Sequence, residues 1–316
     1  TEKIDISGQH VYPGLIDANT VIGLVEISAV RATLDFAEVS EIKPNIRSEV
    51  AINPDSELFP VTRTNGITYA HVIPRGGLIS GTSAMIMMDG WTSEDMTLKA
   101  PIGLMVNWPG MEVSEDPHAT KSKEEQLAAI EKKISTLTNA FADARAYFKA
   151  KSAYKQGNAP FHASDTRWDA MLPILNRELP VLIHAPKIRQ IRAALNWATK
   201  ENLKIVLMTG QDVVLALDLL KENNIPVILE GILTTPTRRW EPFNTSYITP
   251  TKLYEAGIAF CIASTGRSFE AAHVRNLPYH AAMAAAYGLP KAEALKAITQ
   301  YPAQILGVID QIGTLV

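Results

Sequence analysis

The chain has 316 residues, of which 47% are hydrophobic and 20% charged, and its formal net charge is -3. This length exceeds an average domain of roughly 150 residues, but α/β barrels of about 250 residues or more fold as one domain. The near-neutral charge without a clustered basic tract argues against nucleic-acid binding, and no apolar stretch approaches the roughly 20 residues that cross a bilayer.

Short β-rich runs with irregular spacing occupy the first part of the chain. Strands are predicted at 11–18 and 66–72, with weaker candidates at 85–88 and 102–106. The spacing gives no simple repeat here. The first part alone therefore does not define the topology.

A long helix is predicted between 122 and 154. Ser122 and Glu125 have the spacing of a capping box, which marks a helix start. The apolar residues at helical spacing, expected to form its buried stripe, are Leu127, Ile130, Ile134, Leu137 and Phe141. We expect this helix, at about 121–155, to be an excursion on the wall of the domain.

The second half of the chain alternates between strands and helices. Continuous apolar runs at 180–184, 204–208, 226–229 and 258–263 are separated by amphipathic helical patterns. This alternation is typical of βα units whose parallel sheet is covered on both faces. The strand count reaches about eight, which predicts an α/β fold with a (β/α)8 barrel, formed as a single domain over 1–316. The single cysteine, Cys261, lies in the last run and is predicted to be a small buried side chain.

Several segments resemble imidazolonepropionase-related members of the amidohydrolase superfamily. Segment 4–18 resembles the lead-in to their first barrel strand, 179–185 their fifth strand, 275–278 with 284–290 the stretch after strand eight, and 294–299, 302–303 and 305–307 their closing helices. The resemblance implies a barrel of the metal-dependent hydrolase type that hydrolyses C–N bonds other than peptide bonds. It also implies an accompanying β-sandwich, for which we expect no segments within 1–316.

Most positions where the resemblance implies metal ligands carry other residue types. The family's first strand supplies His-x-His, where positions 19–21 here read Asn-Thr-Val. Neither the run ending at 208–210 nor the one at 263–267 offers the implied histidine or aspartate, so His184 is the only matching ligand position. A catalytic zinc needs about three protein ligands. We therefore expect no metal cofactor, and a divalent metal such as zinc only if the family's mechanism survives.

Two catalytic candidates end predicted strands at the carboxyl-terminal rim, where barrel enzymes place their chemistry. Glu230 would act as a general base or anchor a cationic group, and His184, at the family's fifth-strand ligand position, is the other candidate. The alternative for Glu230 is an ion pair with Arg238, Arg239 or Arg267. The alternative for His184 is an imidazole that is hydrogen-bonded at a strand end without a metal ion.

Further side chains are expected to line the mouth and bind substrate. They are Asn19, His71, Thr265 and Arg267. The guanidinium of Arg267 would bind a carboxylate or a phosphate. The Gly-rich stretch 75–83 would form a nest for an anion, although it lacks the Lys-Ser/Thr ending of a P-loop and an ordinary loop is the favoured alternative.

Two functions follow from these observations. The resemblance implies an amidohydrolase that is degenerate because its metal site is lost. The alternative is a non-catalytic barrel that binds a small molecule, or a partner, at the old active-site mouth. The expected partner is a small-molecule ligand, with no nucleic acid and no membrane, while homo-oligomer formation and the compartment stay open.

Overall fold

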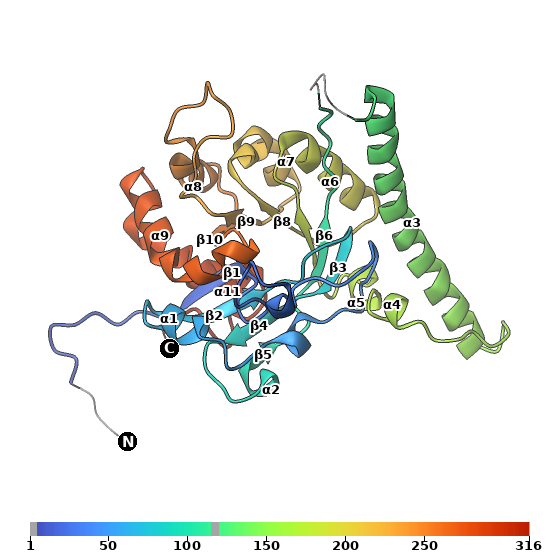
Figure 1. Ribbon diagram of the computed structural model, residues 1–316, viewed down its shortest axis with the longest axis horizontal. Coiled ribbons are helices and arrows are strands. Elements are labelled where there is room, and N and C mark those ends of the chain that lie inside the picture. The colour runs from blue at the N-terminus through green and yellow to red at the C-terminus, as the bar shows by residue number, and fades with distance from the viewer. Residues whose placement is uncertain (1–4, 115–119, 316) are drawn as a thin grey trace.

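The computed structural model describes residues 5–114 and 120–315, so that Ile4, the first residue of the resembling lead-in segment, lies outside the described residues. Helices flank strands that run through the centre of the molecule (Figure 1). The strands are β1 (Leu15–Thr20), β2 (Ile67–Val72), β3 (Ile79–Thr82), β4 (Ala84–Met87), β5 (Thr97–Lys99), β6 (Leu104–Asn107), β7 (Val181–His184), β8 (Ile205–Thr209), β9 (Val227–Glu230) and β10 (Phe260–Ala263). The α-helices are α1 (Leu58–Arg63), α2 (Ser93–Met96), α3 (Lys123–Lys155), α4 (Thr166–Asp169), α5 (Leu172–Leu175), α6 (Ile188–Lys200), α7 (Leu217–Glu222), α8 (Thr245–Glu255), α9 (Leu277–Ala286), α10 (Lys291–Lys296) and α11 (Gln300–Ile305). The 3-10 helices are η1 (Arg31–Thr33), η2 (Ser48–Ala51), η3 (Gln211–Ala216) and η4 (Ser268–Asn276).

The strands form two sheets. A six-stranded sheet has the order β10-β9-β8-β7-β6-β3, and a four-stranded sheet has the order β1-β2-β4-β5. Strands β6 to β10 are parallel, as are β1 and β2, which confirms the parallel βα units expected for the second half. Only Ser83 separates β3 from β4, so the chain passes directly from one sheet to the other.

The prediction of one parallel eight-stranded barrel is met only in part. Within the described ranges no hydrogen-bonded ladder joins β1 to β10, and β3, β4 and β5 pair antiparallel with their neighbours. The two strands still lie side by side, because the backbone N–H of Ser264 donates to Oδ1 of Asp17 at 3.0 Å (Figure 1). The fold is therefore a mixed α/β arrangement in two sheets.

The antiparallel β3 lies in the Gly-rich stretch that was expected to be a loop. Gly81 within β3 has a φ of +128°, and a Cβ there would lie 2.5 Å from the carbonyl oxygen of Ile46. Glycine is thus needed because another segment approaches the backbone closely. Its low strand propensity also hid this strand in the sequence.

Side-chain alternation divides the core into an outer and an inner layer. Along β7, Val181 and Ile183 belong to the cluster packed against the helices, whereas Leu182 belongs to an inner cluster that also holds Met208, Ile228 and Cys261. Successive side chains of a strand point to opposite faces, so each strand sends every second residue inward. Cys261 is buried, as predicted, and burial raises the pKa of its thiol.

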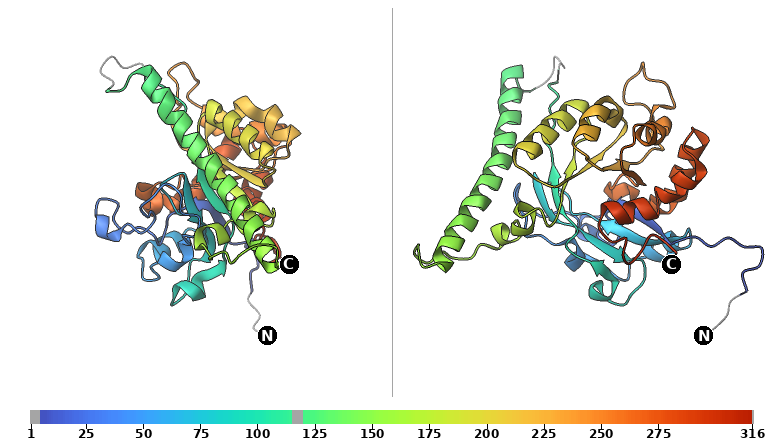
Figure 2. Two further views of the ribbon diagram at one scale, coloured as in Figure 1. Left: turned by 90° about the vertical axis from the view of Figure 1, so that its right-hand side faces the viewer. Right: turned by 180° about the vertical axis from the view of Figure 1, so that it is seen from behind.

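Helix α3 begins and ends close to the predicted limits, and Ser122 and Glu125 do form its capping box. Its buried stripe is shorter than predicted, because Leu137 and Phe141 are buried but Leu127 is 49% exposed. Figure 2 shows the cause, since the amino-terminal turns of α3 extend beyond the rest of the molecule. Despite the 33 residues of this helix, no helix in the described part of the chain is long and apolar enough to cross a membrane.

Candidate functional site

A cavity of about 1240 Å³, here called the mouth, opens at the carboxyl ends of the parallel strands. Its lining includes Asn107 from the end of β6, His184 from the end of β7 and Glu230 from the end of β9. Because Leu182 and Ile228 point into the inner layer, the residues two positions later point the same way. Strand alternation therefore aims His184 and Glu230 into the mouth.

His184 and Glu230 form a direct pair. Nε2 of His184 lies 3.2 Å from Oε2 of Glu230, and the two side chains are 30% and 10% exposed. The side-chain amide of Asn19, at the end of β1, donates to Oε1 of Glu230 at 3.1 Å and to the backbone oxygen of Ser264 at 3.0 Å. Both carboxylate oxygens of Glu230 thus have partners.

Arg75 is a further site residue that was not predicted from the sequence. Its Nη2 donates to Oδ1 of Asn19 at 2.5 Å, and its buried Nε finds no hydrogen-bond partner in the described residues. Gly266 has a φ of +64°, and a Cβ there would overlap both the guanidinium of Arg75 and Oδ1 of Asn19. The sequence feature that could have indicated Arg75 is its position before two glycines and after a predicted strand. That stretch was interpreted only as a backbone nest for an anion.

Electrostatics keep Glu230 ionised. Burial alone would raise its pKa, but the charge and hydrogen bond of His184, together with the charges of Arg75 and Arg267, hold the pKa below its usual value. Burial lowers the pKa of Arg75, while the carboxylate of Glu230 opposes this shift. A guanidinium stays charged at any physiological pH. The mouth therefore contains an ionised carboxylate among fixed positive charges.

Three arginines were considered as ion-pair partners of Glu230, and none forms an ion pair with it among the residues that the structure describes. Arg238 instead binds Asp212 at 2.7 Å and Glu241 at 2.6 Å, which ties the loop after β9 to η3. The ion-pair partner of Glu230 is His184 at the end of β7, which β8 separates from β9 in the sheet order, so the partner could not be found among the residues that follow β9 or its neighbour β10.

The other expected substrate-binding residues divide into two groups. Thr265 and Arg267 line the mouth beside His184 and Glu230. His71 is fully buried, with Nδ1 2.8 Å from the backbone oxygen of Ala18 and Nε2 2.7 Å from Oγ of Ser83. Burial lowers the pKa of His71 to about 4, so it is neutral. The structure brings His71 into the strand packing and away from the mouth.

The residues at the mouth do not fit the divalent metal that the resemblance implies. In the described ranges no group of three or more His, Cys, Asp or Glu side chains is arranged to hold a metal. The hydroxyl of Thr209 donates to the backbone oxygen of Ala185 at 2.7 Å, and Val21 is a buried aliphatic side chain. Arg75 also places its positive charge on the amide oxygen of Asn19, where a cation would bind.

No protein-family model matches the chain, and no curated protein matches its sequence. Among solved structures, an amidohydrolase from Thermotoga maritima MSB8 superposes with a TM-score of 0.82 at 21% identity, covering 100% of this chain and 83% of that one. This likeness shows an amidohydrolase-type fold.

Two other solved structures are similar at lower scores. A prolidase complexed with N-methylphosphonate-L-proline has a TM-score of 0.47 at 12% identity, covering 100% of this chain and 81% of that one. A Xaa-Pro dipeptidase with bound methionine in the active site has a TM-score of 0.42 at 13% identity, covering 96% and 77%. At these scores neither structure supports a conclusion about the site.

Proposed function

We propose that this chain is a degenerate, imidazolonepropionase-related amidohydrolase whose mouth binds a small polar molecule with an anionic group and no longer holds the family's metal. One observation carries the proposal: the network in which Arg75 binds Asn19, Asn19 binds Glu230, and Glu230 pairs with His184. A fixed guanidinium supplies a positive charge beside the amide that stands where the family has its first histidine. In this proposal the guanidinium of Arg75 supplies the positive charge that a metal ion supplies in the family.

Recognition of an anion follows from the charges left over in the mouth. Glu230 already binds His184 and Asn19. Arg267 is an exposed residue of the cavity lining, and its side chain forms no ion pair with the described residues. A guanidinium binds a carboxylate through paired N–H groups. The hydroxyl of Thr265 and the imidazole of His184 add hydrogen-bonding groups for an amide or a hydroxyl of the same ligand.

A second candidate function, metal-free hydrolysis, is favoured by the His184–Glu230 pair itself. An imidazole held 3.2 Å from a carboxylate can take a proton from water, because the carboxylate stabilises the imidazolium that forms. Arg75 and Arg267 would then stabilise the negative charge that develops on a carbonyl oxygen. This candidate requires turnover, whereas the binding function does not.

Binding is tested with N-acetylglycine, a small molecule that carries one carboxylate and one amide. We expect saturable binding by calorimetry to metal-stripped protein, no binding of its methyl ester, and about tenfold weaker binding to Arg267→Gln. Arg239→Gln is the matched control, since Arg239 lies on the nearby loop after β9 and does not line the mouth. Equal binding of acid and ester would overturn anion recognition.

Metal content is measured by elemental analysis of protein purified without chelator. We expect far less than one zinc, nickel, iron or manganese per chain, and the same binding of N-acetylglycine before and after chelation. Near-stoichiometric metal that disappears in His184→Ala would contradict the proposal. Release of glycine from N-acetylglycine by the metal-stripped protein, abolished in Glu230→Gln, would instead establish the hydrolase.

A further inference from the structure

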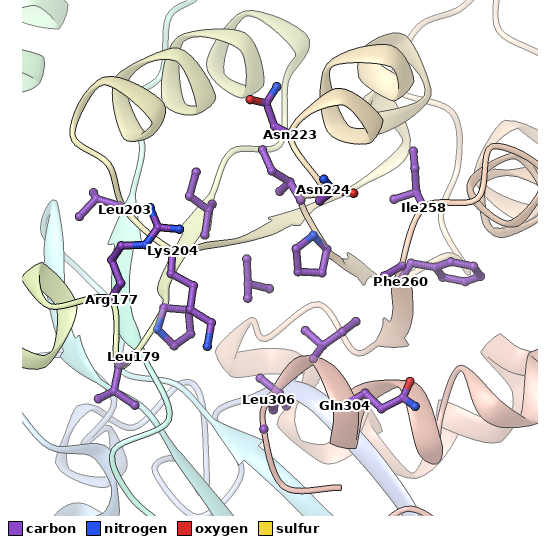
Figure 3. A pocket seen from close by; sticks show the side chains of 18 of the residues that line it. Arg177, Leu179, Leu203, Lys204, Asn223, Asn224, Ile258, Phe260, Gln304 and Leu306 are labelled. Carbon is purple, nitrogen blue, oxygen red and sulfur yellow. The ribbon is translucent and has the colours of Figure 1, made fainter.

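A second hollow lies at the opposite end of the same strands. It measures about 990 Å³ and is lined by residues that precede or begin β7 to β10, with α11 along one side (Figure 3). We call it the basal hollow. It shares no lining residue with the mouth.

The walls of the basal hollow are largely apolar, because most residues at the strand starts are aliphatic, aromatic or proline. Pro180 precedes β7, Pro226 precedes β9 and Ile258 precedes β10. From the other side α11 is followed by Leu306, which is 4% exposed. A volume at the upper end of the usual range for small-molecule sites, about 300–1,000 Å³, with mostly apolar walls suits a small organic ligand.

Positive charge predominates around this apolar surface. The lining includes Lys99, Arg177 and Lys204, against a single carboxylate, Glu178. Oε1 of Glu178 already accepts a hydrogen bond from the side chain of Asn176 at 3.1 Å. Lys204 is exposed and has no hydrogen-bond or ion-pair partner among the described residues. The unbalanced charge is thus cationic and at least partly free.

The charged and apolar sides of the basal hollow face each other. Figure 3 shows Arg177 and Lys204 on one side, and Ile258 and Phe260 on the other. A ligand that spans the hollow would meet cations at one end and hydrocarbon at the other. Such an arrangement selects molecules that are apolar over most of their length and anionic at one end.

We propose that the basal hollow binds a small amphipathic anion, with an aromatic or short acyl body and a carboxylate or sulfonate head. The hollow lies at the amino ends of the strands, and its lining contains no histidine, cysteine or aspartate. The proposal is independent of the function assigned to the mouth, because the two cavities lie at opposite ends of the strands.

The test uses 8-anilinonaphthalene-1-sulfonate, an aryl anion whose fluorescence rises in apolar surroundings, and N-phenyl-1-naphthylamine, which has a similar body without the charge. We expect saturable binding of the sulfonate at one site per chain and weaker binding of the amine. Lys204→Glu is expected to weaken the sulfonate about tenfold and to leave the amine unchanged. Ala259→Trp, at an exposed position of the lining, is expected to weaken both probes by filling the space.

Three controls separate this site from other surfaces. Lys221→Glu changes an exposed lysine outside the lining and is expected to leave both probes unaffected. Arg267→Gln removes a cation of the mouth and is expected to leave the sulfonate unaffected, even if the mouth fails to bind N-acetylglycine. Circular dichroism and the unfolding midpoint verify that each variant is folded.

The proposal is overturned if Lys204→Glu and Ala259→Trp bind the sulfonate as tightly as the unmodified chain. It is also overturned if Lys204→Glu weakens both probes equally, because charge would then play no specific part. A dimer seen by light scattering that Ala259→Trp dissociates would make the basal hollow an interface between copies of this chain. One-site sulfonate binding that is lost in Ala259→Trp and weakened selectively in Lys204→Glu supports it.

Discussion

The two ends of the parallel strands use opposite means to form a cavity. At the mouth, charged and polar side chains from β1, β7 and the loop after β2 bind one another around Glu230. At the basal hollow, cations surround an apolar surface: Lys99 and Arg177 donate to Gly307 and Asn202, whereas Lys204 has no partner in the described part of the chain. Hydrogen bonds and an ion pair among its own side chains therefore fix the shape of the mouth. The shape of the basal hollow instead depends on the apolar core on which its walls rest.

This difference indicates where a substitution should affect folding. A buried polar group left without its partner costs roughly 1–3 kcal/mol, and more when it is charged. An exposed charge contributes little to stability, typically within about 0.5 kcal/mol. Changes to the hydrogen-bonded groups of the mouth should therefore alter stability and binding together, while changes to the charges of the basal hollow should alter binding alone.

The largest effect is expected from Gly266→Ala. The new methyl group would overlap Arg75 and Asn19, and the positive φ of +64° disfavours any side chain. Overpacking and a left-handed backbone together should lower the free energy of unfolding by about 2–4 kcal/mol. Denaturant titration measures this loss, and N-acetylglycine binding should weaken because Arg75 must move.

Gly210→Ala is the matched control for this substitution. Gly210 also lines the mouth, but a Cβ there would meet nothing within 4 Å. Its stability should stay within about 1 kcal/mol of the unmodified chain. If both alanine variants were equally stable, the close packing of Arg75 against Gly266 would not be a feature of the folded protein.

A smaller effect is expected from Glu230→Gln, which removes the carboxylate between His184, Arg75 and Arg267. The buried positive charge of Arg75 would lose its compensation, so we expect a loss of about 1–3 kcal/mol. Affinity for N-acetylglycine should rise, because the mouth becomes more positive. Glu178→Gln makes the same change at the basal hollow and should leave stability within about 0.5 kcal/mol. Equal losses in the two variants would remove the distinction between the ends.

Acid should destabilise the protein through buried histidines. Burial lowers the pKa of His71 and of His280 to about 4, below the ordinary value near 6.5. The unfolded chain therefore binds protons first, and stability falls as the pH drops from about 6.5 toward 4, by about 2 kcal/mol for each histidine at pH 5. Unfolding by urea at pH 7 and pH 5 measures this fall.

Asp17 opposes this fall. Burial raises its pKa to about 6, despite hydrogen bonds from Ser264 and Asn19. Its contribution to stability is therefore present at low pH and is lost as the pH rises through 6. Asp17→Asn should make the loss of stability between pH 7 and pH 5 steeper, whereas His162→Gln on the surface should not alter it. A shallower loss in Asp17→Asn would contradict the raised pKa.

The sequence was most informative where strands are buried on both faces. The runs at 180–184, 204–208, 226–229 and 258–263 became β7 to β10, because a continuous apolar run between turns has few other structures open to it. Strands β3 and β5 were missed, since Gly81 interrupts the first and the second spans only Thr97–Lys99. Their antiparallel pairing depends on contacts that a local pattern does not contain.

The site was predictable only as far as strand ends could be recognised. His184 and Glu230 were placed correctly at the ends of their strands, and the structure pairs them. Arg75 was missed because its partner Asn19 is 56 residues away in the sequence. His71 was assigned to the mouth, but both of its ring nitrogens lie against Ala18 and Ser83 within the strand packing, and these contacts could not be seen in its position near a strand end.

The smallest effect concerns the inner layer that separates the two ends. Cys261 lies in this layer with Leu182, Met208 and Ile228, all fully buried, and burial raises the pKa of its thiol. We expect Cys261→Ala to cost only about 1 kcal/mol, because little volume is lost, and the native thiol to react with a disulfide reagent only after unfolding by urea. Neither N-acetylglycine nor the naphthalene sulfonate should change this reactivity, since each ligand stays on its own side of the layer. A ligand that exposes the thiol without unfolding the chain would show that the two cavities are connected, and the ends could then no longer be treated as separate sites.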